Sequence, residues 1–337
     1  MNSIWKTFLV AENATFVTDT RIIFPAGDSQ QQIYPLTHLA ILSVSGNDAG
    51  KFLQGQITCN VNDITVTQSS LGAMCNPKGR AITTFLLVKS GDDFLLLLPK
   101  ELLQTVKDRL QKYVLRSNVT LTDSSDSLCL LGLSDTSEQT FLASHQQDLV
   151  IRIYFADRCL LIADVNKAMV LWTEYCTHGF QASDSAQWQA LDIMSGIPWL
   201  TVATSEQFIP QMLNLDKLGG ISLTKGCYTG QEIVARTHYL GKAKRALFML
   251  ASDWLENLPI GEKSEQLWYS PSSTSTLPRN AKSPAGNLTN RRLFSPVETQ
   301  LPVLPGTSST LMHQGVTTMP SQCPCQRWKS IASTERA

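Results

Sequence analysis

The sequence predicts an α+β protein. Strand-like apolar runs and amphipathic helical segments occur in the same chain, and they mix without the strict strand-helix-strand repetition of a doubly wound sheet. The length of 337 residues, 43% of them hydrophobic, suffices for a sizeable core and more than one domain.

The first predicted elements lie in residues 38–58, HLAILSVSGNDAGKFLQGQIT. The opening apolar residues suit a strand, the turn at residues 46–48 interrupts it, and a short amphipathic helix follows. Residues 79–99, GRAITTFLLVKSGDDFLLLLP, predict two strands joined by a hairpin turn at residues 90–93.

Two helices and two further strands are predicted next. Residues 100–117 form the clearest helix, because apolar residues recur at helical spacing: Leu102, Leu103, Val106, Leu110, Tyr113 and Val114. The runs SLCLLGLS (127–134) and RCLLIAD (158–164) are strand-like. A second helix is predicted over residues 186–197, AQWQALDIMSGI, and Pro198 stops it.

The composition of the chain changes near residue 265, and the part that follows is expected to be disordered or poorly folded. After about residue 265, roughly two-fifths of the residues are Ser, Thr or Pro, a composition typical of chains that build no packed core. The acids there are Glu298 and Glu335, and the bases include Arg279, Lys282, Arg291 and Arg292. The sequence therefore predicts a basic tail on a slightly acidic body.

The charge balance argues against several classes of protein. With 28 basic and 28 acidic residues there is no global positive field, so tight nonspecific binding to nucleic acid or to an anionic membrane is not expected. The most apolar run, FLLLLPKELL from Phe94, is broken by Pro99 and is too short to cross a bilayer. The first 16 residues lack the apolar core and cleavage site of a signal peptide, so a cytoplasmic location is expected.

Common catalytic and metal-binding motifs are missing from the sequence. The eight cysteines form no CxxC pair, which disfavours a disulfide framework or a zinc site and favours free thiols. The sequence has no GxSxG, P-loop, GxGxxG or HExxH motif, and its five histidines form no ligand-spaced pair, so each is interpreted as a surface or a satisfied core residue. No metal site is predicted.

The chemistry of the chain is concentrated in residues 225–232, KGCYTGQE. Thr229 and Glu232 match a capping box, which predicts a helix from this point to Gly241. Cys227 would then lie near the positive end of the helix dipole and beside Lys225, and both features favour its thiolate. The alternative is a small buried apolar cysteine, and without a partner histidine the thiol identifies no reaction.

The glycines of the motif and the segment before it complete the candidate site. Gly226 and Gly230 leave the backbone open to the close approach of a ligand. Residues 205–226, SEQFIPQMLNLDKLGGISLTKG, carry many amide and hydroxyl side chains and are interpreted as a lining loop. The alternative, an irregular surface connection, stays open.

Residues 208–247, FIPQMLNLDKLGGISLTKGCYTGQEIVARTHYLGKAKRAL, resemble the bacterial folate-binding YgfZ proteins, whose hallmark is K-G-C-[FY]-x-G-Q-E. These proteins are relatives of the aminomethyltransferase, or T-protein, of the glycine cleavage system. Weaker similarity extends over roughly the first 250 residues, through QWQALDIMSGIPWL, GAMCNPKGRAITTFLLV and GKFLQGQITCNV. The resemblance implies an aminomethyltransferase-like α+β domain around a central channel, followed by a small β-barrel. By this resemblance the folate-binding domain covers residues 1–250. Residues 251–337 would be an aberrant or disordered remnant of the β-barrel region, in which a Ser/Thr/Pro-rich tail replaces the barrel.

The resemblance also implies a function and its residues. It implies binding of tetrahydrofolate or a one-carbon derivative, and a role in iron–sulfur enzyme maintenance and tRNA methylthiolation, with iron–sulfur proteins as partners. Cys227 would be the functional thiol and Trp188 would contact the folate ring, although Trp188 also fits a simple core position. The other motif residues carried over are Lys225, Gly226, Tyr228, Gly230, Gln231, Glu232 and Arg236.

The sequence departs from the related proteins at three places. Residues 82–84 carry no carboxylate where the transferases have acidic residues, so glycine-cleavage aminomethyl transfer is not expected. Leu39 stands where the family has a second folate-contacting tryptophan.

The third departure follows residues 242–262, where no alternating strands of a β-barrel occur. We therefore hypothesise a frameshift near residues 262–270. The other two reading frames of the encoding DNA test this hypothesis, and the absence of a barrel-like continuation from both of them would count against it.

The sequence leaves three functions open. The leading one is the folate-binding accessory protein. The alternatives are a folate-dependent aminomethyl or demethylating transferase, and a noncatalytic folate-binding regulatory protein. Since the body lacks a basic, aromatic-rich face, any effect on tRNA is expected to be indirect.

Overall fold

The computed structural model describes residues 1–27, 29–134, 151–155, 158–241, 243, 245–247 and 268–269, with backbone alone at 151–155 and 268–269. The chain forms two units, residues 1–297 and 298–337, and every described residue lies in the first. The predicted disorder of the tail and the hypothesised frameshift near residues 262–270 fall on residues that the structure does not describe, apart from residues 268–269.

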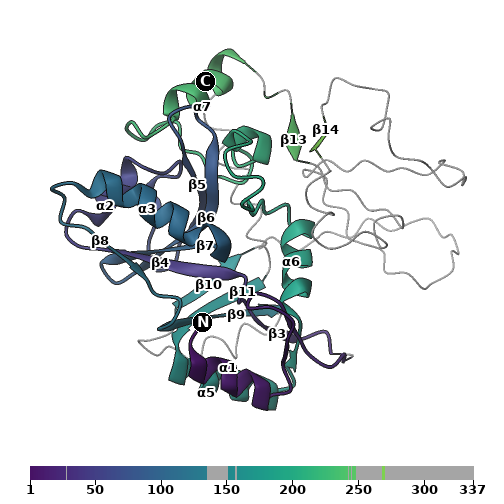
Figure 1. Cartoon of the computed structure of the whole chain (residues 1–337). Helices are drawn as coiled ribbons and strands as arrows, with labels where there is room; N and C mark the ends of the chain where they lie inside the picture. Colours follow the sequence, from purple (N-terminus) through teal and green to yellow (C-terminus); the bar gives the residue numbers. More distant parts are fainter. Residues whose placement is uncertain are drawn as a thin grey trace, which may run out of the picture. The chain divides into compact units, whose positions relative to one another are not determined.

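The first five-stranded sheet is antiparallel throughout and has the order β5-β6-β7-β4-β8 (Figure 1). Its strands are β4 (Leu39–Ser45), β5 (Ser70–Cys75), β6 (Ala81–Ser90), β7 (Asp93–Pro99) and β8 (Thr120–Asp123). The helical elements in this part of the chain are α2 (Ala49–Gln54), η1 (Val61–Asp63), η2 (Lys100–Leu102) and α3 (Leu103–Val114).

The predicted elements of this sheet are confirmed. β4 is followed by a turn and α2, and the β6–β7 hairpin turns through Gly91 at φ 61°, a conformation that suits glycine. The α3 face buries Leu103, Val106, Leu110 and Val114. Tyr113, predicted to lie on that face, is 42% exposed because it lies at the edge of the apolar stripe.

The second five-stranded sheet has the order β10-β11-β9-β3-β12, and only the β12–β3 pair is parallel. Its strands are β3 (Gln32–Pro35), β9 (Leu128–Ser134), β10 (Ile151–Phe155), β11 (Arg158–Asp164) and β12 (Gln181–Ala182). The neighbouring elements are α1 (Ser3–Ala11), β1 (Thr15–Phe16), β2 (Ile22–Ile23), α5 (Val165–Thr177) and α6 (Ser185–Met194). The two predicted strands and the existence of the second predicted helix are thereby confirmed. This helix ends at Met194, before Gly196 at φ 71°, and not at Pro198 as predicted.

Strands β9 and β11 of the second sheet are buried on both faces. Leu130 and Leu160 belong to the hydrophobic core that also contains the first sheet. Their neighbours Leu131 and Leu161 belong to a second core, which contains Trp172 of α5. Because successive side chains of a strand point to opposite faces, both cores draw on the same strands, which explains the continuous apolar runs in the sequence.

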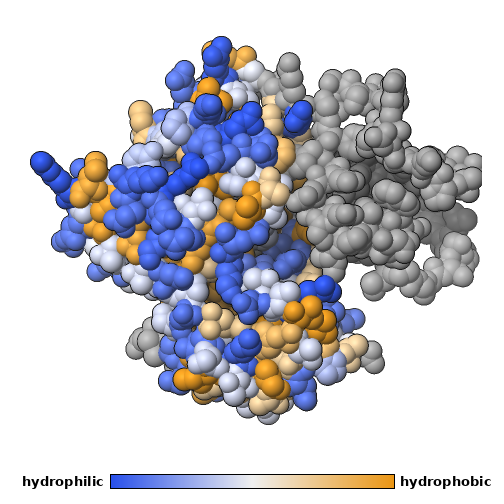
Figure 2. Space-filling view, in the orientation of Figure 1, coloured by the Kyte–Doolittle hydropathy of each residue, from blue (hydrophilic) through white to orange (hydrophobic). Residues whose placement is uncertain are grey.

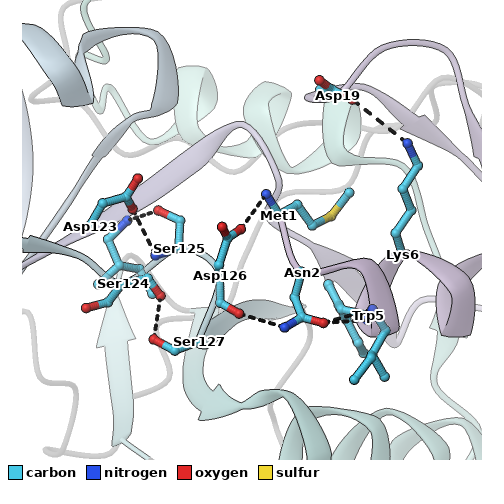
Figure 3. A network of polar contacts seen from close by, with 12 residues as sticks. Met1, Asn2, Trp5, Lys6, Asp19, Asp123, Ser124, Ser125, Asp126 and Ser127 are labelled. Atoms are coloured by element: carbon cyan, nitrogen blue, oxygen red, sulfur yellow. Dashed lines mark hydrogen bonds and ion pairs between the residues drawn. The ribbon is translucent and has the colours of Figure 1, made fainter.

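The N-terminal helix is tied to the connection between β8 and β9 (Figure 3). The Met1 ammonium lies 2.8 Å from an Asp126 carboxylate oxygen, and Asn2 Nδ2 donates to the Asp126 carbonyl at 2.8 Å. Asn2 Oδ1 also caps α1 by accepting from the Ile4 N–H at 2.8 Å. At the other side of α1, Trp5 packs edge-on against Trp172, with ring centres 5.9 Å apart.

The last described elements are η3 (Pro210–Leu213), α7 (Gln231–Leu240), β13 (Ala246–Leu247) and β14 (Trp268–Tyr269). β13 pairs antiparallel with β14, across the predicted boundary at residue 250. The mixture of helices and antiparallel sheets confirms the α+β class. In the described part of the chain, every helix is too short or too polar to cross a membrane.

Candidate functional site

The motif at residues 225–228 alternates between the core and the surface. The side chains of Lys225 and Tyr228 are 8% and 6% exposed, whereas Gly226 and Cys227 between them are exposed. Cys227 is therefore displayed on a short loop with a buried anchor on each side. The alternative of a small buried cysteine is wrong for this thiol.

Lys225 points away from the surface. Its ammonium donates to the carbonyl oxygens of Ile57 and Cys59 at 2.7 and 2.8 Å, and it lies 5.1 Å from the centre of the Tyr228 ring. Burial lowers the pKa of Lys225 to about 8. Sequence proximity had suggested an ammonium beside Cys227, but the hydrogen bonds of this ammonium go to core carbonyls. These contacts do not test the predicted effect of Lys225 on the Cys227 thiolate, and the alkylation experiment described below decides between that effect and a purely structural role of the ammonium.

Tyr228 is the second anchor. Its ring is buried, burial raises the pKa of its phenol, and its hydroxyl has no hydrogen-bond partner within the described residues. The thiols of Cys59 and Cys75 are electrostatic neighbours of this phenol. Burial raises the pKa of each thiol to about 12. These two core thiols are therefore neutral at physiological pH, unlike reactive cysteines of electropositive sites.

The capping box predicted at Thr229 and Glu232 is wrong. Helix α7 begins at Gln231, its N-cap is Gly230 at φ 85°, and no side chain caps it. Thr229 instead donates its N–H to the Gly55 carbonyl at 3.1 Å, and its hydroxyl lies 3.4 Å from Gln56 Oε1. The chain reaches the helix through a left-handed glycine, so Thr229 lies one residue too early to cap it. The predicted end at Gly241 is confirmed.

Two glycines bring the start of α7 against the turn between β5 and β6. Gly230 and Gly79 both have positive φ, at 85° and 69°. A Cβ on Gly230 would lie 2.5 Å from the Asn76 carbonyl oxygen, and one on Gly79 would lie 2.6 Å from Cβ of Ile233. Close backbone approach thus requires glycine at both positions. Gly226, expected to leave the backbone open, has no neighbour within 4 Å of a built Cβ.

Asn76 organises that turn, which sequence reasoning missed. Its Oδ1 accepts from the N–H groups of Lys78 and Arg80 at 2.9 and 3.0 Å, and its Nδ2 donates to Glu206 Oε2 at 2.6 Å. Glu206 also pairs with Arg109 of α3. Residues 76 and 206 are far apart in sequence, so only the Asn-Pro-Lys-Gly turn composition could have pointed to Asn76.

Cys227 lies at a shallow surface depression of about 550 Å³. The depression is lined by Pro77, Cys227, Tyr228, Thr229, Gly230, Gln231, Glu232 and Ala235. The structure thus gathers most of the predicted motif around the thiol, whereas Lys225, Gly226 and the exposed Arg236 lie outside the lining.

The segment 205–226, interpreted from the sequence as a lining loop, does not line this depression. Phe208 and Leu213 are buried in the core, and Gln211 Nε2 donates to the Val234 carbonyl at 2.7 Å, which attaches the segment to α7. The amide and hydroxyl side chains that suggested a binding surface serve in part as internal hydrogen-bond donors. Ser205, for example, donates to the Ile82 carbonyl at 2.7 Å.

Trp188 lies elsewhere, in the core between α6 and the second sheet. It is 2% exposed, the guanidinium carbon of Arg158 lies 4.3 Å from its ring centre, and the Tyr34 ring contacts it at 5.3 Å. A Cβ on Gly132 would lie 2.4 Å from the indole. The structure therefore does not bring Trp188 and Cys227 together, since Trp188 does not line the depression.

A buried ion pair fixes Arg158 over Trp188. Arg158 Nη2 lies 2.6 Å from Asp192 Oδ1, and both side chains are almost fully buried. Asp192 Oδ2 also accepts from the indole N–H of Trp199 at 2.8 Å. Burial raises the pKa of Asp192, and the neighbouring Arg158 charge opposes that rise.

Other predicted positions have structural partners. Thr84 donates to the Pro198 carbonyl and accepts from the Leu200 N–H at 3.3 Å, and Thr83 donates to the Thr84 carbonyl at 3.0 Å. Leu39 is buried at the start of β4, opposite Pro99. These two hydroxyls and this leucine therefore have structural roles in the described part of the chain.

The interpretation of every histidine as a surface residue or a satisfied core residue is wrong for His38. Neither of its ring nitrogens has a hydrogen-bond partner within the described residues, and burial lowers its pKa to about 4. His145 and His313 lie outside those residues. In the described part of the chain, no three His, Cys, Asp or Glu side chains gather into a possible metal site.

The fold and the motif define an aminomethyltransferase-like α+β protein with an exposed cysteine at its surface. Residues 28–151 match the GCVT N-terminal domain. The fold is similar to the glycine cleavage system aminomethyltransferase T from Bartonella henselae, with a TM-score of 0.52 and 14% identity over 65% of each chain. This chain thus covers less than two thirds of that relative.

A second solved structure, the heterotetrameric sarcosine oxidase from Corynebacterium sp. U-96 in complex with pyrrole 2-carboxylate, matches less well. Its TM-score is 0.28 at 14% identity, over 52% of this chain and 90% of that chain.

Proposed function

We propose that the protein is a cytoplasmic folate-binding accessory protein that supports iron–sulfur enzymes and tRNA methylthiolation through Cys227. The observation that carries the proposal is the display of Cys227 on an exposed loop between two buried anchors, beside an open depression. A thiol at an open surface suits exchange with a group on another macromolecule better than it suits an enclosed small substrate. The match to the GCVT N-terminal domain supports the folate part.

The folate part of the proposal places tetrahydrofolate or a one-carbon derivative at Trp188. A flat pterin stacks favourably on an aromatic face. The Arg158 guanidinium covers one face of this indole, 4.3 Å from the ring centre. Folate stacking on Trp188 therefore requires one of two changes. Either Arg158 moves away from the face that it covers, or the opposite face of the indole opens.

The structure gives less support to a one-carbon transferase. Such a reaction needs a carboxylate close to the reacting nitrogen atoms of folate. The hydroxyls of Thr83 and Thr84, which stand in place of the acidic residues, are both engaged by backbone groups. They are structural donors in this chain.

Complementation tests the proposal. A strain lacking its own family member would receive the parent, the Cys227→Ala variant or the Cys176→Ala variant, and methylthiolated tRNA would be scored. Cys176 is the matched control because it is half-buried in α5, far from the motif in sequence. We expect rescue by the parent and by Cys176→Ala but not by Cys227→Ala. Equal rescue by all three would refute a role of the thiol.

Direct titration separates the folate part from the thiol part. We expect tetrahydrofolate to bind the parent and Cys227→Ala equally, and to bind Trp188→Phe more weakly because the indole face is lost while an aromatic filler remains. Absence of binding to the parent would overturn the folate proposal and leave the complementation result unaffected.

A further inference from the structure

We propose that Lys225 is a positioning residue, whose buried ammonium clamps the loop that displays Cys227. The proposal rests on the proposed function only in taking Cys227 as the working thiol. It begins with the acceptors of the ammonium, the carbonyl oxygens of Ile57 and Cys59 at 2.7 and 2.8 Å. The two carbonyls belong to residues two positions apart, and one ammonium with three donor protons can bridge both.

The segment 57–59 is itself firmly held. Ile57 forms an antiparallel bridge with Met74 of β5, and the N–H of Thr58 donates to the Ala73 carbonyl at 2.9 Å. The Thr58 hydroxyl donates to the Gly220 carbonyl at 2.6 Å and accepts from the Ala73 N–H at 2.9 Å. The clamp therefore joins the motif to the edge of the first sheet.

The other contacts of the motif loop lie on either side of the clamp. The Ser222 N–H donates to the Thr58 carbonyl at 2.9 Å, and the Thr229 N–H donates to the Gly55 carbonyl at 3.1 Å. Between these two bonds the loop makes the Lys225 contacts and buries Tyr228, while Cys227 stays exposed. Without the ammonium, the centre of the loop would lose its only pair of bonds to segment 57–59 among those the structure describes.

The chemistry of lysine suits this task. The ammonium is a compact cation with three donor protons on a flexible stem, whereas the arginine fork is planar and wider. Replacement by methionine keeps most of the volume but leaves two carbonyls without their donor, and unpaired buried acceptors are costly. The loop is then expected to detach from segment 57–59 while the sheets remain folded.

Hydrogen exchange resolved by peptide tests the clamp in the full chain. In Lys225→Met we expect the amides of residues 222–230 to exchange at least about tenfold faster than in the parent, with α5 unchanged, because the loss is local. Lys217→Met is the matched control, since Lys217 is exposed on the preceding segment, and its exchange should equal that of the parent. Unchanged exchange at 222–230 in Lys225→Met, or equal acceleration in α5, overturns the clamp.

The pH–rate profile of Cys227 alkylation separates positioning from a direct effect on the thiol. Since the hydrogen bonds of the ammonium go to carbonyls, we expect Lys225→Met to change the maximal rate of alkylation without moving the profile along the pH axis. A shift of the profile by about one pH unit would mean that the charge acts on the thiol, and it would overturn the proposal.

A further measurement needs no variant and covers the case in which Lys225→Met does not fold. In the parent at low urea, the amides of residues 57–59 and 222–230 should open together with one opening free energy, because the clamp joins them. Independent opening of the two segments overturns the clamp. Neither exchange experiment depends on folate or on rescue, so failure of the proposed function would be seen separately.

Discussion

At the scale of single residues, the start of α7 depends on one glycine. Gly230 has φ 85°, and a Cβ there would lie 2.5 Å from the Asn76 carbonyl oxygen. We expect Gly230→Ala to lower the free energy of unfolding by about 2–3 kcal/mol, from left-handed strain together with the contact. Gly226→Ala, with nothing within 4 Å of its Cβ, should change it by less than about 0.5 kcal/mol in urea unfolding. Equal costs for both substitutions would contradict this account.

Lys225 gives the stability a defined pH dependence. Its pKa is lowered to about 8 in the folded protein, so between pH 8 and its ordinary value near 10.5 the unfolded chain binds more protons. Below pH 8 the folded protein bears the whole cost of burying the charged ammonium. This cost decreases as the pH rises from 8 towards 10.5. We expect the unfolding free energy of the parent, relative to Lys225→Met, to rise by a few kcal/mol over this interval. Urea unfolding at several pH values measures it, and a flat or falling difference would contradict the assignment.

The motif and its cysteine could be recognised from the sequence, because spacing and residue type are local properties. The direction of the Lys225 ammonium could not be recognised, because its acceptors lie at residues 57 and 59. The capping box failed for a similar reason, since the left-handed conformation of Gly230 depends on contact with residues 75–79.

At the scale of elements, α6 is attached to β11 by a buried ion pair. Removal of Asp192 leaves the Arg158 cation buried without its partner, which is costly in a protein interior. We expect Asp192→Ala to lower the free energy of unfolding by about 3–5 kcal/mol. Arg109→Met, which breaks the half-exposed pair with Glu206, should cost no more than about 1 kcal/mol. A cost for Asp192→Ala as small as that for Arg109→Met would show that water reaches Arg158.

The elements themselves could largely be predicted from the sequence. Apolar periodicity located β4, β6, β7, β9, β11, α3 and α6, because each has enough residues for a clear pattern. The segment 205–226 could not be assigned this way. Its polar side chains suggested a binding surface, yet Gln211 and Ser205 use theirs to attach α7 and β6.

At the scale of the whole described region, one sheet separates two cores. Strands β9 and β11 supply alternate residues to both, so neither core is complete without the second sheet. Sequence patterns indicated fully buried strands but not the two cores, because the partners of each face come from distant segments such as α1 and β4. This arrangement predicts that the two cores unfold together.

Paired substitutions in the two cores test that coupling. Leu97 belongs to the first core and Leu161 to the second, and both are fully buried. We expect Leu97→Ala and Leu161→Ala each to cost about 2–5 kcal/mol, whereas Val66→Ala at an exposed site should cost less than about 0.5 kcal/mol. In either leucine variant, hydrogen exchange should accelerate in the slowest strands of both sheets by the same factor, because both sheets would open in one cooperative step. Acceleration confined to the sheet that carries the substitution would show that the shared strands do not couple the cores.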